Sequence, residues 1–156
     1  MTERLVLHPF TVAEAERLVA AGQAPAGGYP TGMDVAGARR YLEVCASDGD
    51  PRPFGAYEIR VRADGRAIGG AGFHAAPDDG GAVTIGYGLV EAARGHGYAA
   101  EALRELLRFA RAGGAARVRG DTDRGNVASQ RVMTAAGMRL VAEDDALKYY
   151  ELAWTS

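Results

Sequence analysis

The residues best suited to chemistry form a short turn that follows an apolar stretch. Thr84 to Val90 has the pattern of a β-strand, and an amphipathic helix begins near Tyr98. Gly95 and Gly97 lie between them and carry no side chains, so several backbone N–H groups can point into one small space. The N-terminus of the helix adds partial positive charge, and Arg94 adds a full charge. This combination predicts a binding site for the pyrophosphate of a nucleotide-type cofactor.

The glycine pattern also matches a second kind of nucleotide site. Gly95-x-Gly97-x-x-Ala100 fits the dinucleotide fingerprint G-x-G-x-x-G/A, and Asp121 follows as a candidate ribose-binding acid. Residues 91–94, however, separate the strand from the first glycine, which the fingerprint places directly after the strand. Asp121 also comes later than the usual spacing of about 20 residues, and the segment after it is too short to finish a doubly wound sheet. A plain glycine turn that joins strand to helix is a further interpretation.

A family resemblance accounts for more of the chain. Arg94-Gly-His-Gly-Tyr-Ala99 resembles the R/Q-x-x-G-x-G/A signature of the GNAT superfamily of acyl-coenzyme A-dependent N-acyltransferases. The segment from Asp123 to Met138 is similar to the N-x-x-S…G-F/M stretch of the branch that acetylates ribosomal-protein N-termini and many small amines. The two motifs have the right order and spacing, and the combined match runs from Val83 to about Trp154. The resemblance implies an enzyme, an acetyl-CoA-dependent N-acetyltransferase.

The resemblance also implies how the cofactor is held. The pantetheine arm is expected to pair with the strand that ends at Gly88-Leu89-Val90, and the thioester oxygen is expected to meet a backbone N–H near Leu89. This strand is expected to diverge from the next one, Arg117 to Gly120, beyond a local bulge. The predicted cofactor-binding residues are Leu89, Val90, Arg94, Gly95, His96, Gly97, Tyr98, Ala99, Asn126 and Ser129.

The catalytic acid and base are less directly indicated. Many relatives carry a tyrosine that acts as the catalytic acid seven positions after the asparagine, but that position is Met133 here. Ser129, one helical turn after Asn126, is the predicted acid; a hydrogen bond to the pantetheine or to the helix backbone is its alternative role. Thr84 stands where relatives often carry glutamate. His74, at the end of a strand expected beside that of Thr84, is therefore the predicted base, and its alternative is an exposed turn residue.

The acceptor is expected to be a small amine or a peptide N-terminus. In the resembled family its pocket is formed by the loop that corresponds to Gln23 to Met33 and by the end hairpin, and Tyr29 and Tyr87 are candidate lining residues. The loop has no long acidic run that would attract a basic protein tail. The missing tyrosine and glutamate leave an alternative open, a non-catalytic acyl-CoA-binding sensor of the same fold.

Composition favours a single domain spanning residues 1–156. A net charge of −2 and a pI near 5.9 give no reason to expect nucleic-acid binding. Cys45 is the only cysteine and is expected to be a buried helix thiol, so no disulfide forms and a reducing cytoplasm is the expected location. No apolar run is long enough to span a membrane. We expect no metal site, and a homodimer stays open.

The remaining patterns predict a mixed α+β fold. Its central twisted sheet is mostly antiparallel, with about seven strands and about four helices, and its strands splay at the cofactor site. Thr11 and Glu14 form a capping box, Asp34 is expected to cap a second helix, and Asp64-Gly65 is typical of a type I′ hairpin. In the helix that follows the glycine turn, Glu105 is expected on the solvated face, paired with Arg108.

Overall fold

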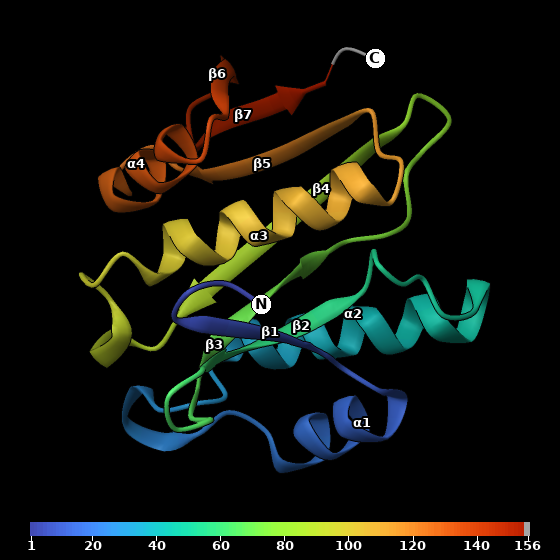
Figure 1. The fold of residues 1–156 in the computed structure, drawn as a ribbon, viewed down its shortest axis with the longest axis vertical. Helices are drawn as coiled ribbons and strands as arrows, with labels where there is room; N and C mark the ends of the chain where they lie inside the picture. Colours follow the sequence, from blue (N-terminus) through green and yellow to red (C-terminus); the bar gives the residue numbers. More distant parts are fainter. Residues whose placement is uncertain (155–156) are drawn as a thin grey trace.

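The computed structural model describes residues 1–154, which form one seven-stranded sheet and four α-helices (Figure 1). The elements are β1 (Leu5–Pro9), α1 (Val12–Ala21), the 3₁₀ turn η1 (Pro25–Gly27), α2 (Gly32–Asp48), β2 (Ala56–Val61), β3 (Ala67–Phe73), β4 (Ala82–Leu89), the 3₁₀ turn η2 (Glu91–Ala93), α3 (Tyr98–Ala112), β5 (Arg117–Asp123), α4 (Val127–Ala135), β6 (Arg139–Glu143) and β7 (Leu147–Ala153). The strand order is β1-β2-β3-β4-β5-β7-β6, and only β4 and β5 are parallel. The predicted mixed α+β fold is confirmed.

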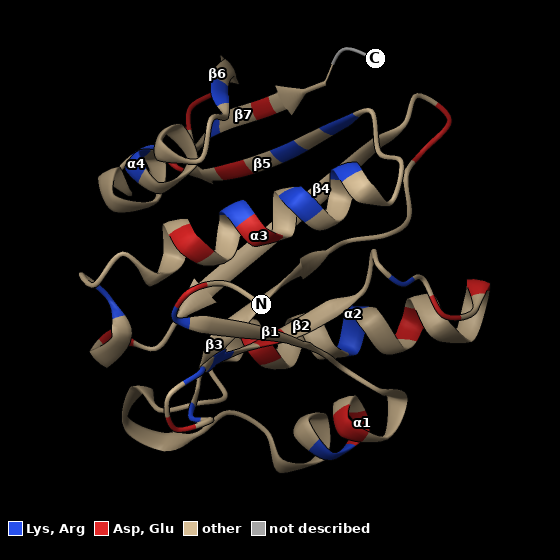
Figure 2. Cartoon of the chain, viewed as in Figure 1, with Lys and Arg blue, Asp and Glu red and all other residues tan. Residues whose placement is uncertain are grey.

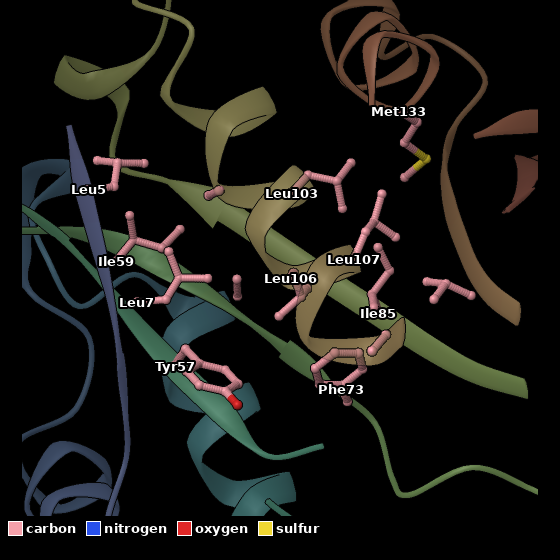
Figure 3. Packing of buried hydrophobic residues seen from close by; sticks show 14 of the residues in the cluster. Leu5, Leu7, Tyr57, Ile59, Phe73, Ile85, Leu103, Leu106, Leu107 and Met133 are labelled. Atoms are coloured by element: carbon pink, nitrogen blue, oxygen red, sulfur yellow. The ribbon is translucent and has the colours of Figure 1, made fainter. Parts of the chain in front are cut away.

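Helices cover both faces of the sheet. On one face, Leu103, Leu106 and Leu107 of α3 pack against strand residues such as Ile85, and Met133 of α4 points toward the same cluster (Figure 3). On the other face, α1 and α2 form a smaller cluster with the residue after β1 and with β2; its buried members are Phe10, Ala15, Ala38 and Tyr41. The period-2 burial of β2 explains how one strand serves both clusters.

The helix α3 has the predicted apolar stripe, but one charged residue is placed differently. Glu105 was expected on the solvated face and is only 5% exposed. The expected partner Arg108 does donate from Nε to its carboxylate, and Met1 lies against the other carboxylate oxygen. Burial follows because the first residues of the chain cover this turn of the helix. The three arginines of α3, Arg104, Arg108 and Arg111, are exposed, and Figure 2 shows where the charged residues lie along the helix.

Two local predictions are wrong, one about the N-cap of α2 and one about the turn between β2 and β3. The N-cap of α2 is Thr31 rather than Asp34, since the Thr31 hydroxyl accepts from the Asp34 N–H at 3.3 Å and the Asp34 carboxylate accepts from the Thr31 N–H at 2.8 Å. Asp34 therefore closes a capping box from the third helical position, and the preceding loop ends two residues earlier than expected. The β2–β3 hairpin is not a type I′ turn, because within it only Gly65 has a positive φ.

The sheet splits between β4 and β5. The two strands pair only from Ala82 to Thr84, whereas β4 continues beside β3 to Leu89 and β5 continues beside β7 to Asp123. Figure 1 shows them separating toward their carboxyl ends, which confirms the predicted splay. The expected bulge is wrong, because the β4 register with both neighbours is regular. Beyond Thr84, β4 keeps its pairing with β3 and β5 keeps its pairing with β7, so the sheet opens only between β4 and β5.

Candidate active site

The end of β4 presents backbone groups to the split. In an antiparallel ladder, alternate residues direct their N–H and C=O groups to the partner strand. His74 N donates to Thr84 O at 2.9 Å and Val90 N donates to Ile68 O at 2.8 Å, so Thr84, Val90 and the even-numbered residues between them face β3. Leu89 and Tyr87 therefore direct their backbone groups toward β5, in the region where β5 has already diverged. An extended ligand can pair with β4 along this edge.

A turn with unpaired donors follows this edge. Gly95 and Gly97 have φ angles of 83° and 81°, a left-handed conformation that side chains disfavour. Gly97 caps α3 without a side-chain hydrogen bond, so the first N–H groups of the helix stay open to a ligand. A Cβ at Gly95 would meet nothing within 4 Å. The predicted residues 94–99 thus form a turn with the donors and the space that a phosphate requires.

The two arginines near this turn have roles that the sequence did not predict. Arg94 donates to Leu89 O from Nε at 3.3 Å and from Nη2 at 3.2 Å, so it fixes the end of β4. Arg4 donates to His96 O at 2.9 Å and to Glu101 at 2.8 Å, and its guanidinium lies 4.6 Å from the centre of the Tyr98 ring.

The charge of Arg4 matters because Glu101 lies in the first turn of α3. A carboxylate there repels an anion bound at the helix N-terminus, and the ion pair with Arg4 neutralises it. Arg4 was missed because it is distant in the chain and no local pattern marks it.

The predicted acid makes an unexpected contact across the split. Asn126 caps α4 as predicted, with its Oδ1 accepting from Ser129 N at 3.1 Å. The Ser129 Oγ lies 2.9 Å from the Tyr87 hydroxyl, which comes from β4. Burial raises the pKa of Tyr87, and the hydrogen bond with Ser129 partly offsets this effect. Met133, at the position of the family's tyrosine, is buried in the core. Tyr87 therefore brings a phenol to Ser129 from another element.

The predicted base lies in a cavity of about 260 Å³ between α2 and strands β3 and β4. The cavity lining includes His74, Tyr87, Asp34 and Arg40. Burial lowers the pKa of His74, the charge of Arg40 lowers it further, and Asp121 opposes them. His74 thus tends to stay neutral, as a proton acceptor must.

Tyr29, a candidate lining residue of the acceptor pocket, donates to Glu58 at 2.7 Å and does not line this cavity. Tyr87, the other candidate, does line this cavity.

The split sheet and the glycine turn identify the class. A family profile described as the acetyltransferase (GNAT) domain matches residues 4–139, so the chain belongs to the GNAT acetyltransferase family. It is an acetyltransferase whose cofactor is acetyl-CoA. The dinucleotide interpretation is excluded, because the sheet has a single parallel pair instead of a doubly wound order. None of the helices within residues 1–154 is long and apolar enough to cross a membrane.

Solved structures share the whole fold at low sequence identity. A GNAT-family acetyltransferase from Bacillus anthracis has a TM-score of 0.71 and 19% identity, with 98% of this chain and 96% of that chain covered. The ribosomal-protein-S5-alanine acetyltransferase from Vibrio fischeri has a TM-score of 0.70 and 13% identity, with 98% and 94% covered. RimL, a ribosomal-protein α-N-acetyltransferase solved with coenzyme A, has a TM-score of 0.68 and 17% identity, with 97% and 95% covered. A comparison with curated protein sequences found no match.

Proposed function

We propose that the protein is an acetyl-CoA-dependent N-acetyltransferase that acetylates a primary amine of a small molecule or a peptide N-terminus. The split between β4 and β5 is the observation that carries this proposal. A strand edge at Leu89 without a partner strand, the glycine turn at Gly95 and Gly97, and a Ser129 hydroxyl that contacts Tyr87 of the same strand support it. Bound acetyl-CoA supplies a thioester that a neutral amine attacks directly.

The pyrophosphate, the pantetheine and the thioester of the cofactor each have a matching group in the chain. The backbone N–H groups of Gly95, His96, Gly97, Tyr98 and Ala99 are suited to the pyrophosphate, and the β4 edge at Leu89 and Val90 is suited to the pantetheine. The N–H of Leu89 faces the split and can donate to the thioester oxygen as negative charge develops on it. Arg94 holds the strand end that carries this donor in place.

Two side chains on opposite sides of the reacting centre handle the protons. His74 accepts the proton that the amine loses as its nitrogen bonds to the acetyl carbon. Ser129 donates a proton to the sulfur as the carbon–sulfur bond breaks, and solvent then restores both side chains. The Tyr87 hydroxyl restricts the direction of the Ser129 hydroxyl through their 2.9 Å hydrogen bond. This donor, and the lowered pKa of His74 in the adjacent cavity, support catalysis over the sensor alternative.

The cavity beside His74 is the proposed acceptor site. Its volume of about 260 Å³ lies just below the range of roughly 300–1,000 Å³ for pockets that hold drug-sized ligands, which supports a small acceptor. The single cysteine, half-buried on α2, supports action in a reducing compartment such as the cytoplasm.

The test is thiol release from acetyl-CoA in the presence of a panel of small amines, amino acids and N-terminal peptides. We expect amine-dependent release, and we expect Ser129→Ala to slow it while the affinity for acetyl-CoA is retained. Binding of acetyl-CoA without any amine-dependent release would contradict the proposal and favour the sensor.

A further inference from the structure

Glycines form both walls of the cavity beside His74. Gly70 pairs with Gly88 and Gly72 pairs with Gly86 across strands β3 and β4, and Gly37 faces them from α2. Tight packing explains part of this set. A Cβ at Gly70 would lie 2.5 Å from the Asp34 Oδ1, and one at Gly72 would lie 3.0 Å from the Gly55 carbonyl oxygen.

Tight packing does not explain Gly37 or Gly86. A Cβ at Gly37 would meet nothing within 4 Å, and one at Gly86 would make an ordinary 3.7 Å contact with His74 Nε2. Gly37 also lies in the middle of a seventeen-residue helix, where glycine is less stable than alanine. Neither position has the positive φ that favours glycine. The protein therefore keeps open a space between α2 and the sheet that its own packing does not require.

The residues that line the cavity include one cation, the solvent-exposed Arg40. Arg40 follows Gly37 by three residues and lies on the same face of α2. Within residues 1–154 its guanidinium makes no hydrogen bond or ion pair, whereas the carboxylate of Asp34, at the other end of this helix face, accepts from Thr31. Arg40 and His74 line the same cavity, and the charge of Arg40 lowers the pKa of His74, so the two groups are electrostatic neighbours.

We infer that the acceptor is a small α-amino acid, with its carboxylate bound by Arg40, its amine at His74 and its side chain between the glycine walls. The carboxylate and amine of an α-amino acid share one carbon, which suits neighbouring partners of this kind. A guanidinium binds a carboxylate through two parallel hydrogen bonds, so it fixes orientation as well as charge. This inference rests on the proposed function and names the substrate class of the same site.

Three matched acceptors test the carboxylate. The kcat/KM for an α-amino acid is compared with that for its amide and its decarboxylated amine, using thiol release at saturating acetyl-CoA. One charge-assisted contact predicts a preference of about 10- to 100-fold for the amino acid. Arg40→Gln should remove most of this preference by raising the KM for the amino acid only. Arg39→Gln is the control, because Arg39 is an exposed residue of the same helix that does not line the cavity.

The possible results separate this inference from the proposed function. Equal use of the amide and the decarboxylated amine, or an intact preference in Arg40→Gln, would overturn the amino-acid assignment and leave the acetyltransferase intact. Preference for long peptides would also overturn it. If no amine gives thiol release although acetyl-CoA binds, the proposed function fails and this inference fails with it.

Discussion

Gly37→Ala should make the protein more stable, whereas a larger side chain at this position should weaken binding of the acceptor. Alanine is favoured over glycine in a helix interior by about 0.5–1 kcal/mol, because it restricts the unfolded chain. A Cβ at Gly37 has open space around it, so no steric cost offsets this gain. For a chain of this size, 1 kcal/mol corresponds to roughly 2–4 °C in Tm. Gly37→Ala should therefore raise Tm by about 1–4 °C.

The effect on activity should have the opposite sign. Gly37→Leu would place a branched side chain in a cavity of about 260 Å³, so it should raise the KM for the acceptor strongly. The KM for acetyl-CoA should stay the same, because none of the proposed cofactor-binding residues lines the cavity that Gly37 faces. The Tm of Gly37→Ala is measured by thermal unfolding, and the acceptor KM of Gly37→Leu is measured by thiol-release kinetics, each against the unchanged protein.

A control substitution on the same helix tests the cause. Ala46→Leu adds similar bulk at an exposed position outside the cavity, so it should leave the acceptor KM unchanged. A lower Tm in Gly37→Ala would show that the position is glycine for packing. An unchanged acceptor KM in Gly37→Leu would refute the argument that the space receives the acceptor.

Three further predictions concern the cofactor and the proton transfers. Arg4→Gln should weaken CoA binding in calorimetry, because the unpaired Glu101 would then repel the phosphates. Adding Glu101→Gln should recover the affinity. If it does not, Arg4 does not act by neutralising Glu101. Ser129→Ala should lower kcat by about 10²–10⁴-fold. Combining it with Tyr87→Phe should lower kcat little further, because the two side chains act through one hydrogen bond. Additive losses in the double variant would show that the two side chains act independently. The rate should rise as the pH passes the lowered pKa of His74, since only the neutral ring accepts a proton. Arg40→Gln should move this rise to higher pH, because the charge of Arg40 lowers the His74 pKa. A rise that persists unchanged in His74→Ala would mean that another group titrates.

The sequence by itself predicted the features that depend on neighbouring residues. Three such features appear where the pattern indicated: the capping box of Thr11 and Glu14, the cap at Asn126 and the glycine turn at residues 94–99. The two caps are reliable signals because each satisfies backbone groups within a few residues of itself, and the glycine turn is marked by glycines at the two positions with a positive φ. The errors at this level were also local. Thr31 and Asp34 cap the same helix jointly, and composition alone did not show which of them begins it.

Only the tertiary structure decided the partners of these motifs. Arg4 reaches the glycine turn from a distant part of the sequence, and Tyr87 of β4 meets Ser129 of α4 beyond the point where β4 and β5 stop pairing. Glu105 is buried because a remote segment covers it. Hydrogen bonds and charge pairs of this kind depend on which surfaces meet when helices pack on a sheet, and no spacing within the chain encodes that meeting. The cavity beside His74 is the clearest case, since its glycines come from one helix and two strands and lie together only in the folded chain.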